Sequence, residues 1–246
     1  MRSKRNQDWW SIVCGGPLAN LVGGALADVA WVTPNRVTWL AFVCKLAVVP
    51  LILIQDARAD LVAVILMQAN VVLDCLDGTL ARYRRTPSVV GAYLDKVTDA
   101  IGLVALMSAF GWRVYRDTGD TYGAILCVAA VMLWLTRIYA YWVIAYFEKE
   151  AGVPKPEAAG EQRRDLGELS FRERLAYYVR STYRILFFAE ADAFFWISLA
   201  VLTGWLRPVA WIYGLGLLFW SVGICIRWLV RAGQIDAWKR AQAGGR

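Results

Sequence analysis

Histidine is absent from the 246-residue chain, and charged residues make up only 19% of it. The absence of histidine excludes a histidine general base, a histidine metal ligand and a Ser-His-Asp relay. Acid–base chemistry in this protein therefore falls to carboxylates. The five cysteines are scattered and odd in number, and most lie in apolar segments. This pattern argues against a disulfide framework or a paired-cysteine site.

The composition is that of a membrane protein. Hydrophobic residues make up 59% of the chain, with 13 tryptophans and a mean hydropathy of +0.43, which predicts an integral membrane protein. The first residues lack the pattern of a cleavable signal peptide, so we expect the spanning segments to direct insertion. The net charge is +7, but no basic helix or aromatic reading surface accompanies it. We therefore expect contact with anionic membrane lipids and not with nucleic acid.

The apolar pattern predicts an all-α fold, a single membrane domain over residues 1–246 with six transmembrane helices. Residues 1–32 predict an N-terminal interfacial amphipathic helix that lies on the membrane, because a Gly-Gly-Pro break interrupts its apolar stretch. Thr33 and Pro34 predict the start of the first span. Six apolar segments between residues 37 and 230 are long enough to cross a bilayer core of about 30 Å. They are residues 37–54, 61–83, 89–112, 122–147, 185–205 and 208–230.

The polar segments complete this topology. Residues 148–170 predict a loop, a second interfacial helix is expected from near Phe171, and residues 231–246 predict a fraying cytoplasmic tail. With six spans, 20 of the 27 Lys and Arg fall on the side of the two termini and only 4 on the other. The positive-inside rule then places both termini in the cytoplasm, in a bacterial-type inner (plasma) membrane.

Four aspartates lie at the cytoplasmic ends of the second and third spans: Asp74, Asp77, Asp95 and Asp99. Within each helix the paired acids are three or four residues apart and share a face. A short hairpin at residues 84–88 can turn the two pairs toward each other. Clustered carboxylates at the edge of an apolar segment need a counter-charge. Oxygen ligands favour hard cations, so we expect two divalent metal ions, Mg²⁺ or Mn²⁺.

Two divalent ions predict a diphosphate substrate, because they would neutralise its charge. Arg82, with Arg84 and Arg85 nearby, adds phosphate-directed donors. Gly78, Ala81 and Gly91 would permit close approach of backbone or ligand. The alternative interpretation is that the four aspartates are helix-end carboxylates that face water and pair with local arginines. Matching faces and small neighbours favour a functional site.

These residues together resemble a known family signature. The order Asp74-x₂-Asp77-Gly78-x₂-Ala81-Arg82-x₈-Gly91-x₃-Asp95-x₃-Asp99 is similar to that of the CDP-alcohol phosphotransferases, integral membrane enzymes that make phospholipids and related phosphodiesters. The signature covers about a tenth of the chain. The segment TPNRVT before the first span and the six-span layout also resemble the family.

The resemblance implies a role for each matching residue. Asp74, Asp77, Asp95 and Asp99 correspond to metal ligands, and Asp99 also to the general base that takes the acceptor hydroxyl proton. The positions that line the cytidine diphosphate pocket are Gly78, Ala81, Arg82 and Gly91, with Asn35 and Thr38 as a softer match. The implied reaction is attack of an alcohol on the β-phosphorus of a CDP-alcohol, which releases CMP. CDP-diacylglycerol is the favoured donor; a soluble CDP-linked headgroup with a lipid or polyol-phosphate acceptor is the alternative.

Two rival functions use similar acids. An intramembrane prenyltransferase also binds a diphosphate through paired aspartates and Mg²⁺, but it does not explain the glycines, Ala81 and Arg82 at these spacings. A divalent-cation transporter would place its carboxylates near the bilayer midplane on several helices. Release of CMP distinguishes the transferase from both rivals. A homodimer is common in the family, although no residue here predicts one.

Four further charges lie in or beside the last three spans: Arg137, Arg184, Glu190 and Asp192. Arg137 and the two acids either pair with one another as structural ion pairs or line an acceptor pocket, in which Arg137 or Arg184 would bind an anionic acceptor. Lys96 is expected to face away from Asp95 and to extend toward the interface.

Overall fold

The computed structural model describes residues 8–86, 88–153 and 170–244, and every regular element in them is helical. The elements are η1 (Ser11–Gly15), α1 (Gly16–Leu26), α2 (Pro34–Ile54), α3 (Ala57–Tyr83), α4 (Val89–Thr118), α5 (Thr121–Glu150), α6 (Phe171–Ser181), η2 (Thr182–Phe187), α7 (Glu190–Thr203) and α8 (Leu206–Gly244). The all-α class is confirmed. Most of the loop predicted at 148–170 lies outside the described residues.

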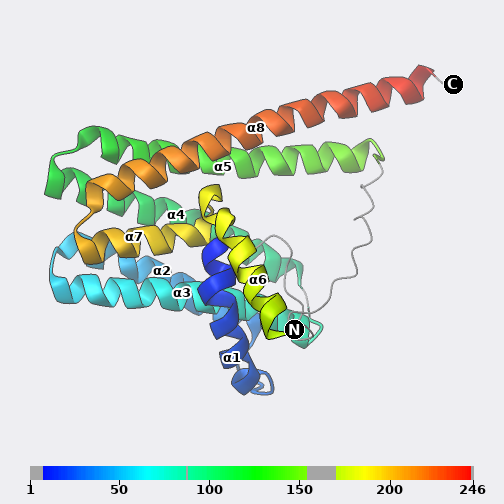
Figure 1. The fold of residues 1–246 in the computed structure, drawn as a ribbon. Coiled ribbons are helices and arrows are strands. Elements are labelled where there is room, and N and C mark those ends of the chain that lie inside the picture. Colours follow the sequence, from blue (N-terminus) through cyan, green and yellow to red (C-terminus); the bar gives the residue numbers. More distant parts are fainter. Residues whose placement is uncertain (1–7, 87, 154–169, 245–246) are drawn as a thin grey trace.

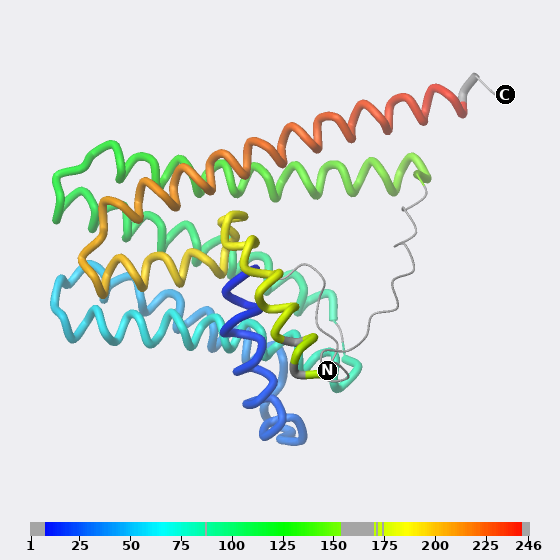
Figure 2. The backbone as a smooth tube through the Cα atoms, viewed as in Figure 1, coloured from blue at the N-terminus to red at the C-terminus, as the bar shows by residue number. Residues whose placement is uncertain are grey.

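Six helices form a bundle around one core, and two short helices cross its end. In Figure 1, α2, α3, α4, α5, α7 and α8 run roughly along one direction, whereas α1 and α6 lie across it. Every helix of the bundle contributes fully buried side chains to the same apolar core; examples, from α2 to α8, are Val48, Met67, Leu106, Val131, Ile197 and Leu217. The backbone trace in Figure 2 shows α5 and α8 extending together beyond the other helices.

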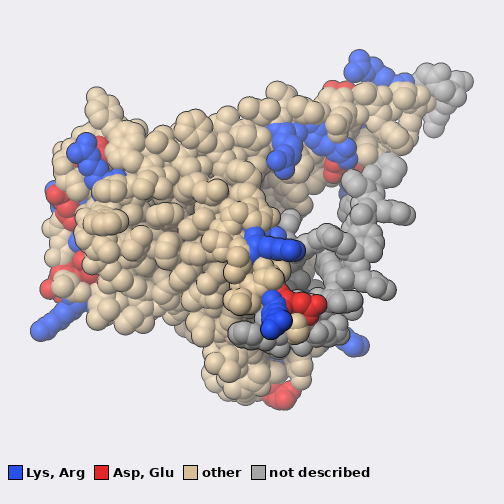
Figure 3. Space-filling model, in the orientation of Figure 1, with Lys and Arg blue, Asp and Glu red and all other residues tan. Residues whose placement is uncertain are grey.

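Several helices meet the length and hydropathy of a membrane span. These are α2, α3, α5 and α8, and a fifth span results if the strongly bent pair of Leu175–Phe187 and Glu190–Thr203 is taken as one. An uncharged band separates charged groups at the two ends of the face shown in Figure 3. These features indicate an integral membrane protein. Helix α4 is not among the candidate spans, so six spans stay a prediction.

The fifth predicted span, 185–205, is not one continuous helix. The chain forms a 3₁₀ turn through Thr182–Phe187, takes a left-handed conformation at Phe188 (φ 44°), and starts α7 only at Glu190. The helical segment Leu175–Phe187 meets α7 at an angle of 82°. At the start of α7 the Asp192 carboxylate accepts a hydrogen bond from the Ala189 N–H at 3.1 Å. That acceptor satisfies a free backbone donor and favours a helix start here.

The predicted fraying tail is also wrong for most of its length, because α8 continues to Gly244. The extension packs against the end of α5. Arg231 Nε lies 2.6 Å from Glu148 Oε1, and the Lys239 ammonium lies 5.4 Å from the centre of the Phe147 ring. Contacts with α5 therefore add to the helix propensity of this segment, which is rich in alanine, arginine and glutamine.

The Gly-Gly-Pro segment at residues 15–17 does not break the N-terminal helix. Residues 11–15 widen into a π-helical turn in which Gly16 N–H bonds the carbonyl of Ser11, and α1 continues from there with Pro17 in its first turn. A proline in the first turn leaves no missing hydrogen bond, since the first amides of a helix lack intrahelical acceptors. The widened turn carries the chain past the Gly-Gly-Pro segment without a break.

Hydrogen bonds attach this N-terminal segment to the bundle. The Trp10 indole donates to Gln68 of α3 at 2.7 Å, and Gln68 donates to the Ser198 hydroxyl of α7 at 2.9 Å. The Trp10 backbone N–H donates to Asp192 at 2.9 Å. The polar residues of α3 and α7 are thus satisfied by a segment that precedes the first long helix in sequence.

Arg113 joins three helices at the end of the bundle opposite Asp74 and Asp77. Its side chain is buried, forms two hydrogen bonds of 3.0 Å to Asp60, and donates to the Ile52 carbonyl at 2.7 Å. It also pairs with Asp117. The bidentate geometry and the backbone bond use the planar guanidinium in a way that lysine could not reproduce.

Arg113→Met should lower the free energy of unfolding by about 3 kcal/mol, because removing one partner leaves the half-buried Asp60 carboxylate uncompensated. Thermal unfolding in detergent measures the effect. Arg116→Met is the matched control. Arg116 is more exposed, and its single contact with Asp117 is longer, at 3.5 Å, so the change should cost less than about 1 kcal/mol. Equal losses for the two variants would contradict the assignment.

Candidate functional site

Helices α2, α3 and α4 place all the predicted site residues in one cavity of about 1990 Å³. Drug-sized ligands usually occupy roughly 300 to 1,000 Å³, so the cavity has room for two substrates. The ten predicted residues that line it are Asn35 and Thr38 from α2, Asp74, Asp77, Gly78, Ala81 and Arg82 from α3, and Gly91, Asp95 and Asp99 from α4. The structure therefore brings together residues up to 64 positions apart in sequence.

Three carboxylates converge in the cavity. Asp74, Asp95 and Asp99 are half-buried, and each offers an oxygen within 4.8 Å of those of the other two. Asp74 makes no hydrogen bond or ion pair with any described residue. A half-buried carboxylate without a partner, beside two more carboxylates, is a group that a bound cation would stabilise. The donor set of oxygens fits a hard divalent ion.

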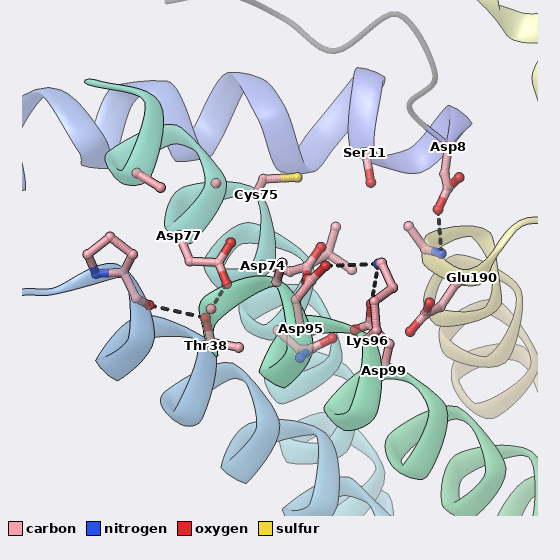
Figure 4. Close-up of a pocket in the computed structure, with 18 of the residues that line it drawn as sticks. Asp8, Ser11, Thr38, Asp74, Cys75, Asp77, Asp95, Lys96, Asp99 and Glu190 are labelled. Carbon is pink, nitrogen blue, oxygen red and sulfur yellow. Dashed lines mark hydrogen bonds and ion pairs between the residues drawn. The ribbon is translucent and has the colours of Figure 1, made fainter. Parts of the chain in front are cut away.

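Asp77 lies to one side of this cluster, as Figure 4 shows. It is buried, and its carboxylate is 2.5 Å from the hydroxyl of Thr38, which is also 3.1 Å from the Pro34 carbonyl. The hydroxyl carries one proton, and the shorter contact is with Asp77. Thr38 thus touches one of the predicted metal ligands.

Gly91 of α4 lies close to the Asn35 side chain of α2. A Cβ atom at this position would lie 3.0 Å from the Asn35 side-chain oxygen and 2.9 Å from the Ser88 hydroxyl, which caps α4 by accepting from the Gly91 N–H. Any larger residue would press on both groups. Gly78 has more freedom, since a Cβ there would meet only the mobile end of Arg82, at 3.1 Å.

Two lysines surround Asp99. The Lys45 ammonium lies 3.1 Å from one carboxylate oxygen of Asp99 and 3.2 Å from Glu190, and the Lys96 ammonium lies 3.3 Å from the other oxygen of Asp99. Lys96 is also 2.8 Å from Asp95, so the expectation that it faces away from Asp95 is wrong. Its long side chain reaches back across the helix.

The far wall of the cavity comes from the N-terminal segment, α5, α7 and α8. Asp8 accepts a hydrogen bond of 3.1 Å from the Ala191 N–H at the start of α7. Burial raises the pKa of the Asp8 carboxyl above its ordinary value, and the Ala191 hydrogen bond opposes that shift. Arg137 and Glu190 line the same region. Figure 4 shows Asp8 and Glu190 on the opposite side of the aspartate cluster from Asp77.

The family model for CDP-alcohol phosphatidyltransferase matches residues 31–216, the range that contains every predicted site residue. The chain belongs to this family. It is therefore an enzyme that transfers a phosphate group from a CDP-alcohol to an alcohol acceptor. No curated protein matches the chain significantly. The matched range includes the wall residues of α5 and α7 but not Asp8.

In this CDP-alcohol phosphotransferase the predicted ion pairs among Arg137, Glu190 and Asp192 do not form. Glu190 pairs instead with Lys45 of α2, and Asp192 accepts from the backbone of Trp10 and Ala189. Asp192 and Arg184 lie outside the cavity lining. Lys45 was missed as a site residue; the available signal was a lone lysine in the middle of an apolar span, which needs a partner.

Arg84 is not available to bind phosphate, contrary to the sequence-based expectation. Its guanidinium donates hydrogen bonds of 2.7 to 3.4 Å to four backbone carbonyls of the turn between α1 and α2, those of Leu26, Ala27, Val29 and Val32. These carbonyls lie at a helix end and in a turn, where backbone acceptors lack regular partners. Arg82 and the exposed Arg85 also line the cavity, and Arg82 uses only one nitrogen in its hydrogen bond to the Thr79 hydroxyl, at 3.2 Å, so its other donors can face an anion.

Arg84→Met should therefore lower stability by about 2 kcal/mol and speed amide exchange in residues 26–33, because charged hydrogen bonds to buried carbonyls are lost. Thermal unfolding and hydrogen–deuterium exchange measure the two effects. Arg85→Met, the same change at the next residue, should leave both unchanged. Faster exchange in both variants would contradict a stabilising role that is specific to Arg84.

Proposed function

We propose that this protein transfers a phosphatidyl group from CDP-diacylglycerol to the hydroxyl of a second alcohol and releases CMP. The observation that carries the proposal is the convergence of Asp74, Asp95 and Asp99 in a cavity large enough for two substrates. Family membership sets aside the prenyltransferase and the cation transporter. The identity of the donor and the roles of single residues are the proposed part.

Two divalent cations, Mg²⁺ or Mn²⁺, fit the donor set, with Asp74, Asp95 and Asp99 as ligands and Asp77 at the side of the cluster. When bound, the ions would neutralise the diphosphate and make its phosphorus more electrophilic. The unpartnered Asp74 carboxylate supports this assignment. Thr38 would hold the Asp77 carboxylate in one orientation through its hydroxyl.

The chain's own residues would bind and orient the donor. Arg82 projects from the end of α3 toward the cavity and would pair with a phosphate oxygen. Ala81 and the two glycines of the motif leave room for the nucleotide, and Asn35 beside Gly91 offers an amide to it. These groups come from three helices, α2, α3 and α4, and would fix the long and flexible diphosphate at several points.

The lining of α5 and α8 supports a lipid-linked donor. The residues there are large and mostly apolar: Trp134, Ile138, Tyr141, Trp142, Ile224 and Trp228. Acyl chains would be favoured next to such side chains, whereas a soluble CDP-linked headgroup would gain little from them. The positive-inside distribution supports a cytoplasmic site in a bacterial-type plasma membrane. A homodimer remains a prediction.

Asp99 would take the proton of the acceptor hydroxyl. The acceptor oxygen forms a bond to the β-phosphorus, the bond from that phosphorus to the bridging oxygen breaks, and CMP leaves with the bridging oxygen. The proton moves to a carboxylate oxygen of Asp99. No histidine competes for this role anywhere in the chain.

Purified protein should release CMP from CDP-diacylglycerol only when an acceptor alcohol and Mg²⁺ or Mn²⁺ are present. A panel of CDP-alcohols crossed with acceptors such as glycerol phosphate, inositol phosphate and serine tests this, with the CMP measured by chromatography. Chelation should stop the release and re-addition of metal should restore it. Turnover of a soluble CDP-linked headgroup, but not of the lipid donor, would overturn the choice of donor.

Asp99→Ala should abolish CMP release while CDP-alcohol binding stays measurable by calorimetry, because the change removes the base and only one of the proposed ligands. A loss of kcat of at least about a hundred-fold is expected for a missing general base. Loss of donor binding instead would make Asp99 mainly a ligand. Asp74→Ala provides the comparison, since it should weaken binding itself.

A further inference from the structure

Lys45 crosses the bundle through a gap that only a glycine leaves open. Its side chain is 4% exposed and runs from α2 over Gly102 of α4. A Cβ atom at position 102 would overlap Cδ of Lys45 and lie 2.8 Å from its Cγ. Burying an ammonium in this way is costly without partners. The path of Lys45 therefore requires both the glycine at position 102 and acidic partners at its end.

At its end Lys45 makes two ion pairs that differ in what they join. One is to a single oxygen of Asp99, Oδ1, and the other is to Glu190 at the first residue of α7. The Phe194 ring, 5.6 Å from the ammonium, lies along the same path. Because both the aliphatic part of the side chain and the ammonium group are enclosed, the lysine has few alternative rotamers.

Lys96 contacts the same carboxylate but is held differently. Its side chain is 54% exposed and pairs with both Asp95 and Asp99, so it can turn into water when another cation takes its place. Lys45 has no such freedom. Of the two contacts, the one to Oδ1 is made by the more enclosed lysine.

We propose that Lys45, threaded past Gly102 and held by Glu190, is a positioning residue that fixes one oxygen of Asp99 and so directs the other toward the acceptor hydroxyl. The inference rests on the proposed function, in which Asp99 takes the acceptor proton. Proton transfer needs the carboxylate oxygen within hydrogen-bond distance of the hydroxyl. A rotation of the Asp99 carboxylate would lose that distance while the donor site remained intact.

The competing explanation is that Lys45 only balances the negative charge of Asp99 and Glu190. The two explanations differ in a double variant. Lys45→Met with Glu190→Gln removes one positive and one negative charge and leaves unbranched side chains of similar size, so it restores the balance but not the contact with Asp99. Charge balance predicts recovery of turnover, whereas positioning predicts none.

The test measures CMP release, donor binding and thermal stability for Lys45→Met and for the double variant. We expect kcat to fall roughly ten- to hundred-fold in both, as misplacement of a reacting group does, with calorimetric binding of the CDP-alcohol changed by less than about three-fold. Turnover by the double variant at the level of the unmodified protein would overturn the proposal. So would a Lys45→Met protein with unchanged kcat.

Gly102→Ala tests the same contact without removing any charged group, and it guards against a Lys45 variant that fails to fold. The added methyl displaces the lysine, so kcat should fall as in Lys45→Met. Gly223→Ala is the matched control, because a Cβ at that position of α8 meets nothing within 4 Å. In a Lys45→Ala background, Gly102→Ala should cost nothing further. A full additional loss there would overturn the proposal.

Failure of this inference and failure of the proposed function give different results. If Asp99→Ala keeps its turnover, the role of Asp99 as base is wrong and the positioning role falls with it. If Asp99→Ala is inactive but Lys45→Met and Gly102→Ala are both fully active, only the role of Lys45 is wrong.

Discussion

The structure depends on how the negative charge of acids inside an apolar bundle is compensated. Five carboxylates gather where α2, α3, α4 and α7 meet, and an ionised carboxylate away from water is costly unless it is paired. The chain supplies two lysines to one side of the cluster. On the other side Asp77 has neutral hydrogen-bond donors, such as the Thr38 hydroxyl, and Asp74 has no partner among the described residues. The compensation is therefore incomplete, and the deficit lies where a cationic cofactor would bind.

Two of the three glycines of α4, Gly91 and Gly102, face polar side chains of α2. Helices α2 and α4 run in the same direction, since α3 returns between them. Asn35 and Lys45 are ten residues apart on α2, and Gly91 and Gly102 are eleven apart on α4, which correspond to heights of about 15 and 16.5 Å. Each polar side chain of α2 thus meets a glycine of α4 at the matching level. At Lys45 and Gly102 the same pair of positions determines both the packing of the two helices and the compensation of Asp99.

The aspartate motif could be predicted from the sequence because it depends on local spacing. The other features of the site could not, because they depend on contacts between distant parts of the chain. Asp95 and Asp99 share a helical face by their separation alone, and Thr33 starts α2 as expected. The pairing of Lys45 with Glu190 joins residues 145 apart in sequence, which no periodicity reveals. The break at Phe188 likewise depends on contacts between helices. The helical tail beyond Arg231 is a different case, because its alanine, arginine and glutamine residues themselves favour a helix.

The ion pairs of Lys45 also connect the two walls of the cavity. The motif side lies within the family range, and the opposite wall includes Asp8, which lies before it. Asp8 binds the Ala191 N–H while the adjacent Glu190 binds Lys45, so the first turn of α7 is held from both sides. An acid at a helix N-terminus is favoured by the backbone donors there. The orientation of Asp99 is consequently linked, through one lysine and one helix end, to a segment outside the family signature.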